Sequence, residues 1–469
     1  MTAAIAPPKA PTFDWKRWPE TEALVDGLIA DALQGNAFAA ELARRMEAET
    51  STRFTDWVDH LVVGDRPGLV AELERAGYRR EATDYAVGTP VFGHDGGIFP
   101  RVAVAKGHEG QIREVAIKVE SVAAFSRAHD LGLDVVGMPM GPYRIGRVGG
   151  QPTTLAAVER RAYRGFEPFP GELAREGRMA PHAARDLIAA RELWQGRRRR
   201  FDDDEEGLDA TEALLGRLVG LVGRDPACHV VFEGERDYWQ SRNRAARVQK
   251  GRQDRLGLGW ANHDHHTFRC SRRLFPRIIG IFRALGFDLR ERFHAGQHAG
   301  WGAQVLEHAT TGIVIFADLD LAPDEVDADF ARDALPDLPR PNTVGLWVAL
   351  HGESILEAGM HHLEAQFDFD ALRAGLEAEA GIATMKPFSD FPFLRQAFTA
   401  GERWPVAKAR ADRALALGWI DPDQHARFLA EGAIGSHLEN LQRHEGYKGF
   451  NQQAVSAIIA ATDPRLRQG

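Results

Sequence analysis

The stretch NHDHHTFRCSRRLFPRIIGIFRALGFDLRERF, residues 262–293, decides the fold. Residues 262–269 predict a strand, and the apolar residues from Phe275 to Leu285 recur at helical spacing. Gly286 is typical of a helix end, and a second strand is expected after it. The segments 300–308 and 311–321 predict two more strands. The predicted order is a β-α-β-β-β unit.

An earlier part of the chain repeats this organisation, with VDHLVV (58–63) followed by LVAELERAGYRRE (69–81). Both copies have Asp-His on the first strand and an aromatic residue after the helix-ending glycine. Further strands are again expected, here within 90–105 and 113–122. One such unit cannot bury the faces of its own small sheet. We therefore expect the two units to pair into one curved, barrel-like sheet.

The predicted fold class is α+β, with paired β-α-β-β-β modules, a helical insert and a helical C-terminal region. In the last region, NTVGLWVALHG (342–352) predicts a strand and residues 422–446 predict a helix. No role is predicted for the insert or for the aromatic, proline-rich segment 385–393. The expected regions are an N-terminal helical leader at 1–50, the first module at 51–155, the helical insert at 156–257, the second module at 258–325 and a mostly helical region at 326–469.

The composition argues against several classes of protein. The 469 residues carry a net charge of −9, so no basic excess is available for nucleic acid or an anionic membrane. The two cysteines, Cys228 and Cys270, cannot build a disulfide framework or a cysteine-based zinc site. No signal peptide or membrane span is predicted. We expect a cytoplasmic protein without nucleic-acid or membrane partners; its oligomeric state is not predicted.

The histidine cluster at 263–266 indicates a metal site. On an extended strand, His265 and Arg269 share a face, which places a metal ligand near a guanidinium suited to a carboxylate. His60 occupies the equivalent strand position of the first unit. Glu307 lies in an otherwise apolar strand, where an unpaired carboxylate is costly. We expect His60, His265 and Glu307 to bind one metal ion, and two histidines with one carboxylate are typical of non-haem iron(II).

The sequence leaves alternatives to this ligand set. His362 is an alternative to His60 as the second histidine, although the residues that follow it favour the surface of an amphipathic helix. A divalent ion other than iron is also compatible with these ligands. The carboxylates that compete with Glu307 are Asp318 and Asp320.

The motifs HHTFR and VLEH resemble the vicinal oxygen chelate superfamily and, within it, the 2-oxoadipate dioxygenase/decarboxylase family, also called hydroxyglutarate synthases. That family carries His-x-x-x-Arg on the first strand of each half and a late glutamate on a strand. His265 and Arg269 match the motif, and Glu307 is similar to the late glutamate. His60 is similar to the first histidine, but Gly64 stands where the family has arginine. The resemblance covers about residues 50–130 and 258–325.

The resemblance implies an oxidoreductase: a mononuclear Fe(II)-dependent dioxygenase/decarboxylase that acts on a small 2-oxo or related carboxylic acid with dioxygen. Arg269 would bind the substrate carboxylate. Other readings are a different metal-dependent member of the superfamily, such as an isomerase, lyase or extradiol-type oxygenase, or a non-enzymatic protein that binds a small ligand. The residues expected to line the entrance are Gln304, His294, His298 and Trp301, and Gln304 is expected to act in catalysis together with Arg269.

Overall fold

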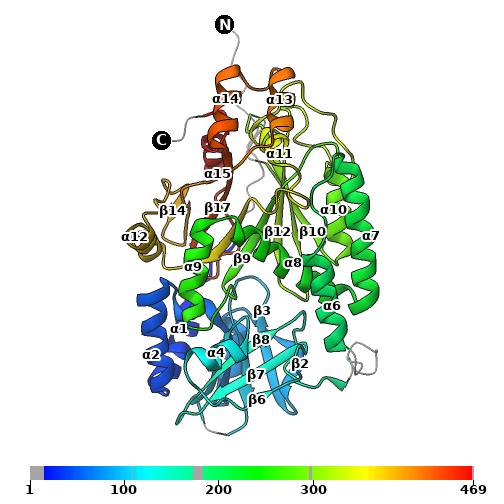
Figure 1. Cartoon of the computed structure of the whole chain (residues 1–469). Coiled ribbons are helices and arrows are strands. Elements are labelled where there is room, and N and C mark those ends of the chain that lie inside the picture. Colours follow the sequence, from blue (N-terminus) through cyan, green and yellow to red (C-terminus); the bar gives the residue numbers. More distant parts are fainter. Residues whose placement is uncertain (1–14, 108, 172, 174–182, 295–297, 467–469) are drawn as a thin grey trace.

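The computed structural model describes residues 15–107, 109–171, 173, 183–294 and 298–466. Two large β-sheets form the body of the protein, one below the other in Figure 1, with helices around them. Each sheet contains two β-α-β-β-β modules, so the described chain has four modules where the sequence predicted two. The α+β class with paired modules is confirmed, and it is the arrangement that the vicinal oxygen chelate resemblance implies.

The first sheet has the strand order β2-β3-β4-β1-β5-β8-β7-β6. Strand β1 is parallel to β4 of its own module and antiparallel to β5, the first strand of the next module. The elements of these two modules are β1 (Val58–Gly64), α3 (Leu69–Arg75), β2 (Tyr78–Ala86), β3 (Thr89–His94) and β4 (Arg101–Ala105), then β5 (Ile112–Lys118), α4 (Val122–Ala128), β6 (Val135–Val136), β7 (Tyr143–Val148) and β8 (Thr154–Arg160).

The second sheet repeats this plan, with the order β10-β11-β12-β9-β13-β17-β15-β14 and β16 paired to β17. Strand β9 is parallel to β12 and antiparallel to β13, and β13 is parallel to β17. The elements of its modules are β9 (His263–Arg269), α10 (Phe275–Ala284), β10 (Asp288–His294), β11 (Trp301–Glu307) and β12 (Val314–Asp320), then β13 (His362–Gln366), α12 (Phe369–Ala380), β14 (Ser389–Phe391), β15 (Leu394–Phe398), β16 (Glu402–Trp404) and β17 (Ala433–Arg443).

The two units recognised in the sequence do not pair with each other. Strand β1 uses its free edge to pair with β5, and β9 uses the equivalent edge to pair with β13. The next module along the chain therefore completes each sheet, and no edge of β1 or β9 is left for the expected joint barrel. The C-terminal part, expected to be mostly helical, contains helices but also supplies all strands of the fourth module.

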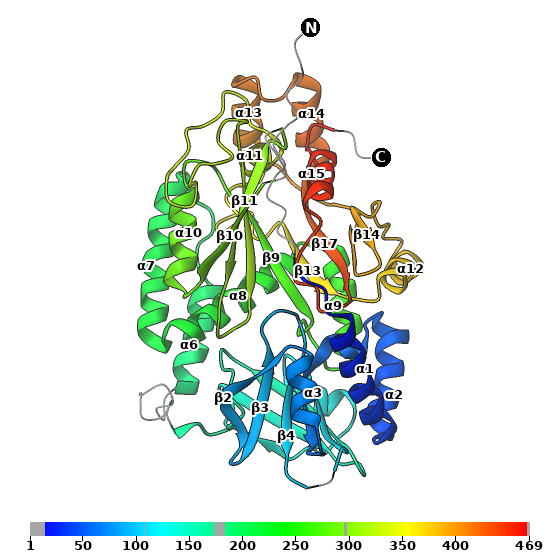
Figure 2. The same ribbon diagram turned by 180° about the vertical axis from the view of Figure 1, so that it is seen from behind.

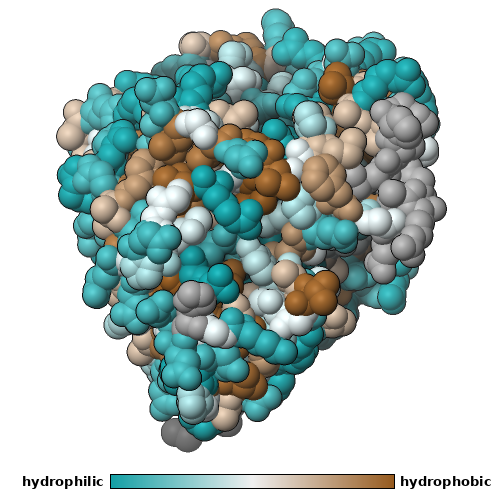
Figure 3. All heavy atoms as spheres, turned by 90° about the horizontal axis from the view of Figure 1, so that it is seen from below, coloured by the Kyte–Doolittle hydropathy of each residue, from teal (hydrophilic) through white to brown (hydrophobic). Residues whose placement is uncertain are grey.

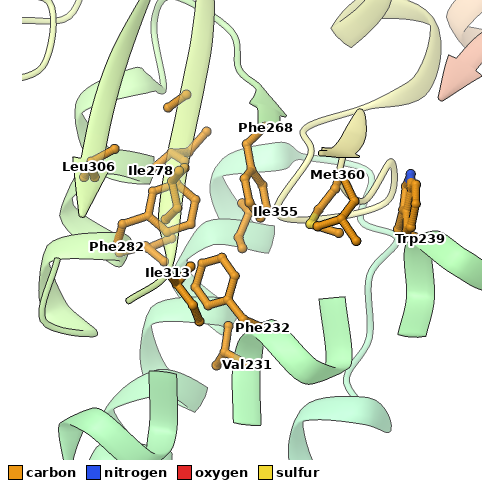
Figure 4. Packing of buried hydrophobic residues seen from close by; sticks show 14 of the residues in the cluster. Val231, Phe232, Trp239, Phe268, Ile278, Phe282, Leu306, Ile313, Ile355 and Met360 are labelled. Atoms are coloured by element: carbon orange, nitrogen blue, oxygen red, sulfur yellow. The ribbon is translucent and has the colours of Figure 1, made fainter. Parts of the chain in front are cut away.

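Within the insert predicted at 156–257, residues 156–160 belong to β8, and residues 183–255 contain four helices that cover the outer face of the second sheet. Phe232 of α8 packs against Phe268 of β9 and Phe282 of α10, with ring centroids 6.0 and 6.3 Å apart (Figure 4). Because side chains alternate along a strand, Phe268 in this core fixes His265 and Arg269 on the opposite face. The helices of the insert are α6 (Ala183–Gln195), α7 (Asp204–Val222), α8 (Arg224–Ser241) and α9 (Arg244–Arg255).

The remaining helices pack around the two sheets (Figures 1 and 2). Residues 342–352, predicted as a strand, contain a helix, α11, because the run is apolar all round and buried rather than alternating. In the described part of the chain, no helix combines the length and apolar character needed to cross a membrane. These helices are α1 (Pro19–Gln34), α2 (Ala37–Arg45), a π-helix (Met46–Thr50), a 3-10 helix (Phe54–Trp57), α11 (Thr343–His351), α13 (Lys408–Ala416), α14 (Pro422–Glu431) and α15 (Gln452–Ala461).

The face seen from below in Figure 3 carries hydrophobic residues in small groups among hydrophilic ones. Large apolar side chains are exposed at isolated points of the described chain, such as Ile98 and Leu221. Scattered exposure of this kind is ordinary for a globular protein and carries no functional meaning.

Candidate metal centre

Three side chains with metal-ligating atoms meet on one face of the second sheet. His265, His362 and Glu439 come from β9, β13 and β17, which are consecutive in the sheet (Figure 2). One ligand atom of each lies within 4.8 Å of the others. Glu439 Oε2 is 3.0 Å from His362 Nε2 and 3.8 Å from His265 Nε2. Their neighbours Leu363 and Leu438 belong to the hydrophobic core on the helical side, so strand alternation gathers the three polar groups.

Nδ1 of each histidine contacts a neighbouring side chain. His265 Nδ1 lies 2.5 Å from Glu364 Oε2, and His362 Nδ1 lies 2.8 Å from His361 Nδ1. Both rings therefore turn Nε2 toward Glu439. A metal-binding histidine in proteins almost always has its second nitrogen bound in this way.

The carboxylates of the site are crowded and deeply buried. The Gln396 amide donates to Glu364 Oε1 at 2.8 Å and to Glu439 Oε1 at 3.2 Å, which holds the two acids side by side. Burial, and then repulsion from Glu364, raise the pKa of Glu439 well above its usual range. Burial lowers the pKa of His362 well below its usual range. A neutral imidazole beside crowded carboxylates is a donor set that a divalent cation would satisfy.

A second group of possible ligands, Asp264, His265 and Glu364, shares His265 with the first. Here a cation is already present, because Arg443 Nη2 lies 3.1 Å from Asp264 Oδ2 and 3.7 Å from Glu364 Oε2. Burial lowers the pKa of His265, but Glu364 and Asp264 outweigh burial and raise it to about 9. These acids therefore orient His265 and already have counter-charges of their own.

Arg269 lies on the same face of β9 as His265, as strand alternation predicts. Its side chain is 2% exposed, and Nε and Nη1 have no hydrogen-bond partner among the described residues. No carboxylate of the described chain lies within 4.0 Å of its guanidinium, although Asp318, Asp320 and Asp463 are close enough to act on its pKa. Burial lowers the pKa of Arg269 to about 10. A buried guanidinium without a partner is costly unless a ligand supplies an anion.

His265, His362, Glu439 and Arg269 line one cavity of about 50 Å³. Aromatic rings lie against both histidines: the Phe316 ring centroid is 4.5 Å from that of His265, and the Phe398 centroid is 4.9 Å from that of His362. The cavity is therefore small and apolar, with polar groups at its metal-ligating end and at Arg269. The other apolar residues that line it are Phe293, Trp301, Phe388, Phe450, Val455 and Ile459.

His60 is not brought near His265, since it lies in the first sheet. It is 0% exposed, with Nδ1 2.7 Å from Asp59 Oδ2 and Nε2 3.4 Å from Glu114 Oε1. When His60 is aligned with His265, the strand registers put Glu114 at the place of His362 and Ala156 at that of Glu439. The first sheet thus lacks the second histidine and the facing carboxylate, and it is His362, the alternative to His60, that lies beside His265.

The other predicted site residues also lie outside the metal-ligating group. The Glu307 side chain is 46% exposed at the end of β11, 3.6 Å from Arg290. Gln304 faces away from the cavity and donates to the carbonyls of Glu291 and Val305, both at 2.9 Å. The entrance segment predicted around these residues includes 295–297, which lie outside the described residues; Trp301 does line the cavity.

The competing carboxylates have other positions. Asp318 lines the cavity near Arg269, and burial raises its pKa to about 7. Asp320 accepts hydrogen bonds from the backbone N–H groups of Asn342 and Val344 at the start of α11. Neither belongs to the group that includes both histidines.

Sequence reasoning missed Glu439 and undervalued His362. The helix predicted for 422–446 ends at Glu431, and β17 begins after Gly432. Gly432 has a φ of 73°, and a Cβ there would lie 2.3 Å from the Trp404 carbonyl oxygen, so this glycine was the signal for a break. The pair at 361–362 is buried at the start of β13 instead of lying on a helix surface.

No family model and no curated protein matches the chain. Solved structures similar to it include a mutant of 4-hydroxymandelate synthase from Streptomyces coelicolor, with 12% identity, a TM-score of 0.28, and coverage of 87% of this chain and 98% of that one. Methylmalonyl-CoA epimerase from Mycobacterium tuberculosis has 13% identity and a TM-score of 0.22, over 39% of this chain and 88% of that chain. A xylose isomerase-like TIM barrel/4-hydroxyphenylpyruvate dioxygenase fusion protein has 12% identity and a TM-score of 0.23, over 90% of this chain and 56% of that chain. Because these TM-scores are low, the fold rests on the strand order and the site on its geometry.

Proposed function

We propose that the chain is a mononuclear non-haem Fe(II)-dependent dioxygenase that decarboxylates a small 2-oxo or related carboxylic acid. The observation that carries the proposal is the meeting of two histidines and one carboxylate in a cavity that also contains an arginine with no ion-pair partner among the described residues. Two-histidine, one-carboxylate sets are typical of non-haem iron(II), because three protein ligands leave positions for substrate and dioxygen.

His265, His362 and Glu439 would hold the metal. When bound, the metal supplies the Lewis-acid and redox chemistry by which a 2-oxo acid reacts with dioxygen. Glu364 and His361, which contact Nδ1 of His265 and of His362, would leave each Nε2 available to the metal. Gln396 fixes the remaining oxygen of Glu439.

Arg269 would bind a carboxylate of the substrate. Its guanidinium is buried, lies on the cavity wall and has no carboxylate of the described chain within salt-bridge distance. Arginine can hold a carboxylate through two parallel hydrogen bonds, which fixes orientation as well as charge. The aromatic walls exclude water around the reacting end, which strengthens each of these charge interactions.

The test uses protein purified without oxygen and loaded with Fe(II). A panel of 2-oxo acids is added, and oxygen uptake and carbon dioxide release are measured together. We expect at least one acid to give equal uptake and release, and the Arg269→Gln variant to lose this activity at low substrate concentration. Iron-loaded protein that takes up no oxygen with any acid, but converts a substrate without it, would support an isomerase or lyase instead.

A further inference from the structure

A second, larger cavity of about 450 Å³ lies between the two sheets. Its walls are the ends of β1, β5 and β8 in the first sheet, and α8, the residues before β9 and the turn 309–313 in the second half. In Figure 1, α8 crosses the middle of the molecule, above the first sheet. Exposed residues at its rim, among them Asp95 and Arg164, show that the cleft reaches the surface.

Arg236 on α8 enters this cleft with unused hydrogen-bond donors. The residue is 7% exposed, and its one hydrogen bond runs from Nη1 to His266 Nε2 at 3.3 Å. No carboxylate of the described chain lies within 4.0 Å of the guanidinium. Burial of an arginine without a counter-ion is unfavourable, and the described residues do not supply an anion for this guanidinium.

Lys118, at the end of β5, is a second cation in the cleft without a partner. No hydrogen bond or salt bridge joins its ammonium group to the described residues, although Asp56, Asp59 and Asp264 are close enough to act on its pKa. Each of these acids is bound to an arginine of its own. Their charges are therefore already balanced, and burial lowers the pKa of Lys118.

Two histidines add neutral donors to the same wall. Neither ring nitrogen of His229 has a hydrogen-bond partner among the described residues, and His263 uses only Nδ1, 2.8 Å from the Trp260 carbonyl oxygen. The His263 ring packs against the ring of His266, which contacts Arg236, with the two ring centroids 5.3 Å apart. His229, Glu233 and Arg236 lie on one side of α8 by helical spacing.

The acids of the cleft do not neutralise these cations, because most have partners elsewhere. Glu233 binds Arg191, with Nε 3.0 Å from Oε2, and Glu120 lies 3.1 Å from Lys250 Nζ. Glu81 faces Arg101 at 3.3 Å. The cleft thus combines two cations that form no salt bridge with the described residues and histidine nitrogens that have no hydrogen bond to them, in a space large enough for a metabolite.

We propose that this cleft binds a small organic anion through Arg236 and Lys118. The ligand carries a phosphate or carboxylate group with two negative charges, which matches the two cations, and His229 supplies a further hydrogen bond. Charge-assisted hydrogen bonds from arginine and lysine are the usual means of holding such groups.

The anion site is distinct from the metal-ligating cavity. His265 and Arg269 face that cavity, whereas His266, between them on β9, points to the opposite side and contacts Arg236. The second sheet therefore separates the two sites. The proposal does not rest on the identity of the metal or on the oxygenase activity.

Calorimetric titration of the full chain with inorganic phosphate, and separately with malonate, tests the proposal at constant ionic strength. We expect one of the two to bind saturably at one site per chain in protein from which iron has been removed; the anion that binds identifies the group. Arg236→Gln should weaken binding at least tenfold, as expected for the loss of a charge-assisted hydrogen bond of about 1.5 kcal/mol or more. Lys118→Gln should do the same and remains informative if Arg236→Gln does not fold.

Two matched variants locate the site. Lys408→Gln removes a charge from a side chain that is 75% exposed on α13, and Arg269→Gln removes the cation of the metal-ligating cavity. Both should change the affinity less than twofold. Absence of saturable binding by either anion, or binding that depends on Arg269 and not on Arg236 or Lys118, would overturn the proposal. If the iron-loaded wild type binds the anion but shows no oxygenase activity, the result would count against the proposed function and not against the anion site.

Discussion

His265 and Glu364 lie 2.5 Å apart, through Nδ1 and Oε2, on neighbouring strands of the second sheet. This contact decides which nitrogen of His265 is available. With Nδ1 committed to a carboxylate, Nε2 is the atom that faces His362 and Glu439. The contact would also make the imidazole a better metal ligand, since a carboxylate behind a histidine increases its basicity.

Glu364→Gln should therefore weaken metal binding without removing a ligand. The amide oxygen can still accept from Nδ1, but the negative charge behind the ring is lost. We expect metal affinity to fall about tenfold to a hundredfold, which is usual when a residue that hydrogen-bonds to a metal ligand is changed. Competition with a fluorescent chelator measures it. Glu114→Gln, a buried carboxylate near His60 in the first sheet, is the control and should leave the affinity unchanged.

Arg269→Gln should raise the KM for the acid substrate more than it lowers kcat. The lost contact is between a charged donor and a carboxylate and is worth about 2 kcal/mol, which corresponds to a KM increase of about 30-fold. Steady-state oxygen uptake provides both constants. Arg277→Gln, at a half-buried position of α10 that pairs with Asp209 of α7, removes the same charge and should leave both constants unchanged. An unchanged KM in Arg269→Gln would show that this arginine does not touch the substrate.

Glu353 should make the fold less stable as the pH rises. It is 0% exposed, and burial raises its pKa to about 7, above the usual 4.5. Because the pKa of Glu353 is higher in the folded state, its contribution to stability is complete below pH 4.5. This contribution is lost as the pH rises through 7. The contribution is at most about 3 kcal/mol. Urea unfolding at pH 5 and pH 8 should show that Glu353→Gln removes this part of the pH dependence, whereas Glu431→Gln on α14 does not.

The Asp59–Arg160 pair should be important for the stability of the first sheet. Arg160 Nε and Nη2 each donate to Asp59 at 2.8 Å, and both side chains are largely buried. Arg160→Met would leave Asp59 without its main counter-charge, so we expect a loss of about 3 kcal/mol in the free energy of unfolding. The exposed pair Lys408–Asp412 is the comparison, and Lys408→Met should leave the free energy of unfolding nearly unchanged. Equal losses in the two variants would contradict this assignment.

The sequence predicted the β-α-β-β-β unit well where hydrophobic periodicity and helix-ending glycines agreed, as in 262–293. It also placed His265 and Arg269 on one face, because strand alternation is local. The pairing of modules could not be predicted in the same way. Which edge of β9 meets which strand depends on modules whose strands are short or interrupted, such as β6 and β14.

The ligand set was only partly predictable for the same reason. The Asp-His pair occurs on the first strand of both sheets. In each sheet the aspartate binds an arginine at the end of the last strand of the second module: Asp59 binds Arg160, and Asp264 binds Arg443. The sequence repeat therefore corresponds to a structural repeat, but what the two sheets share is this ion pair and not a metal ligand set. His362 and Glu439 have no counterparts in the first sheet, so the repeat could not reveal them.

Metal content of two histidine variants tests the central claim most directly. Wild type, His362→Ala and His60→Ala are purified without oxygen, supplied with Fe(II), desalted, and analysed for iron and other divalent metals by mass spectrometry. The account predicts about one metal ion per chain in the wild type and in folded His60→Ala, and loss of it in His362→Ala. Full metal in His362→Ala, or its loss in His60→Ala alone, would contradict the account.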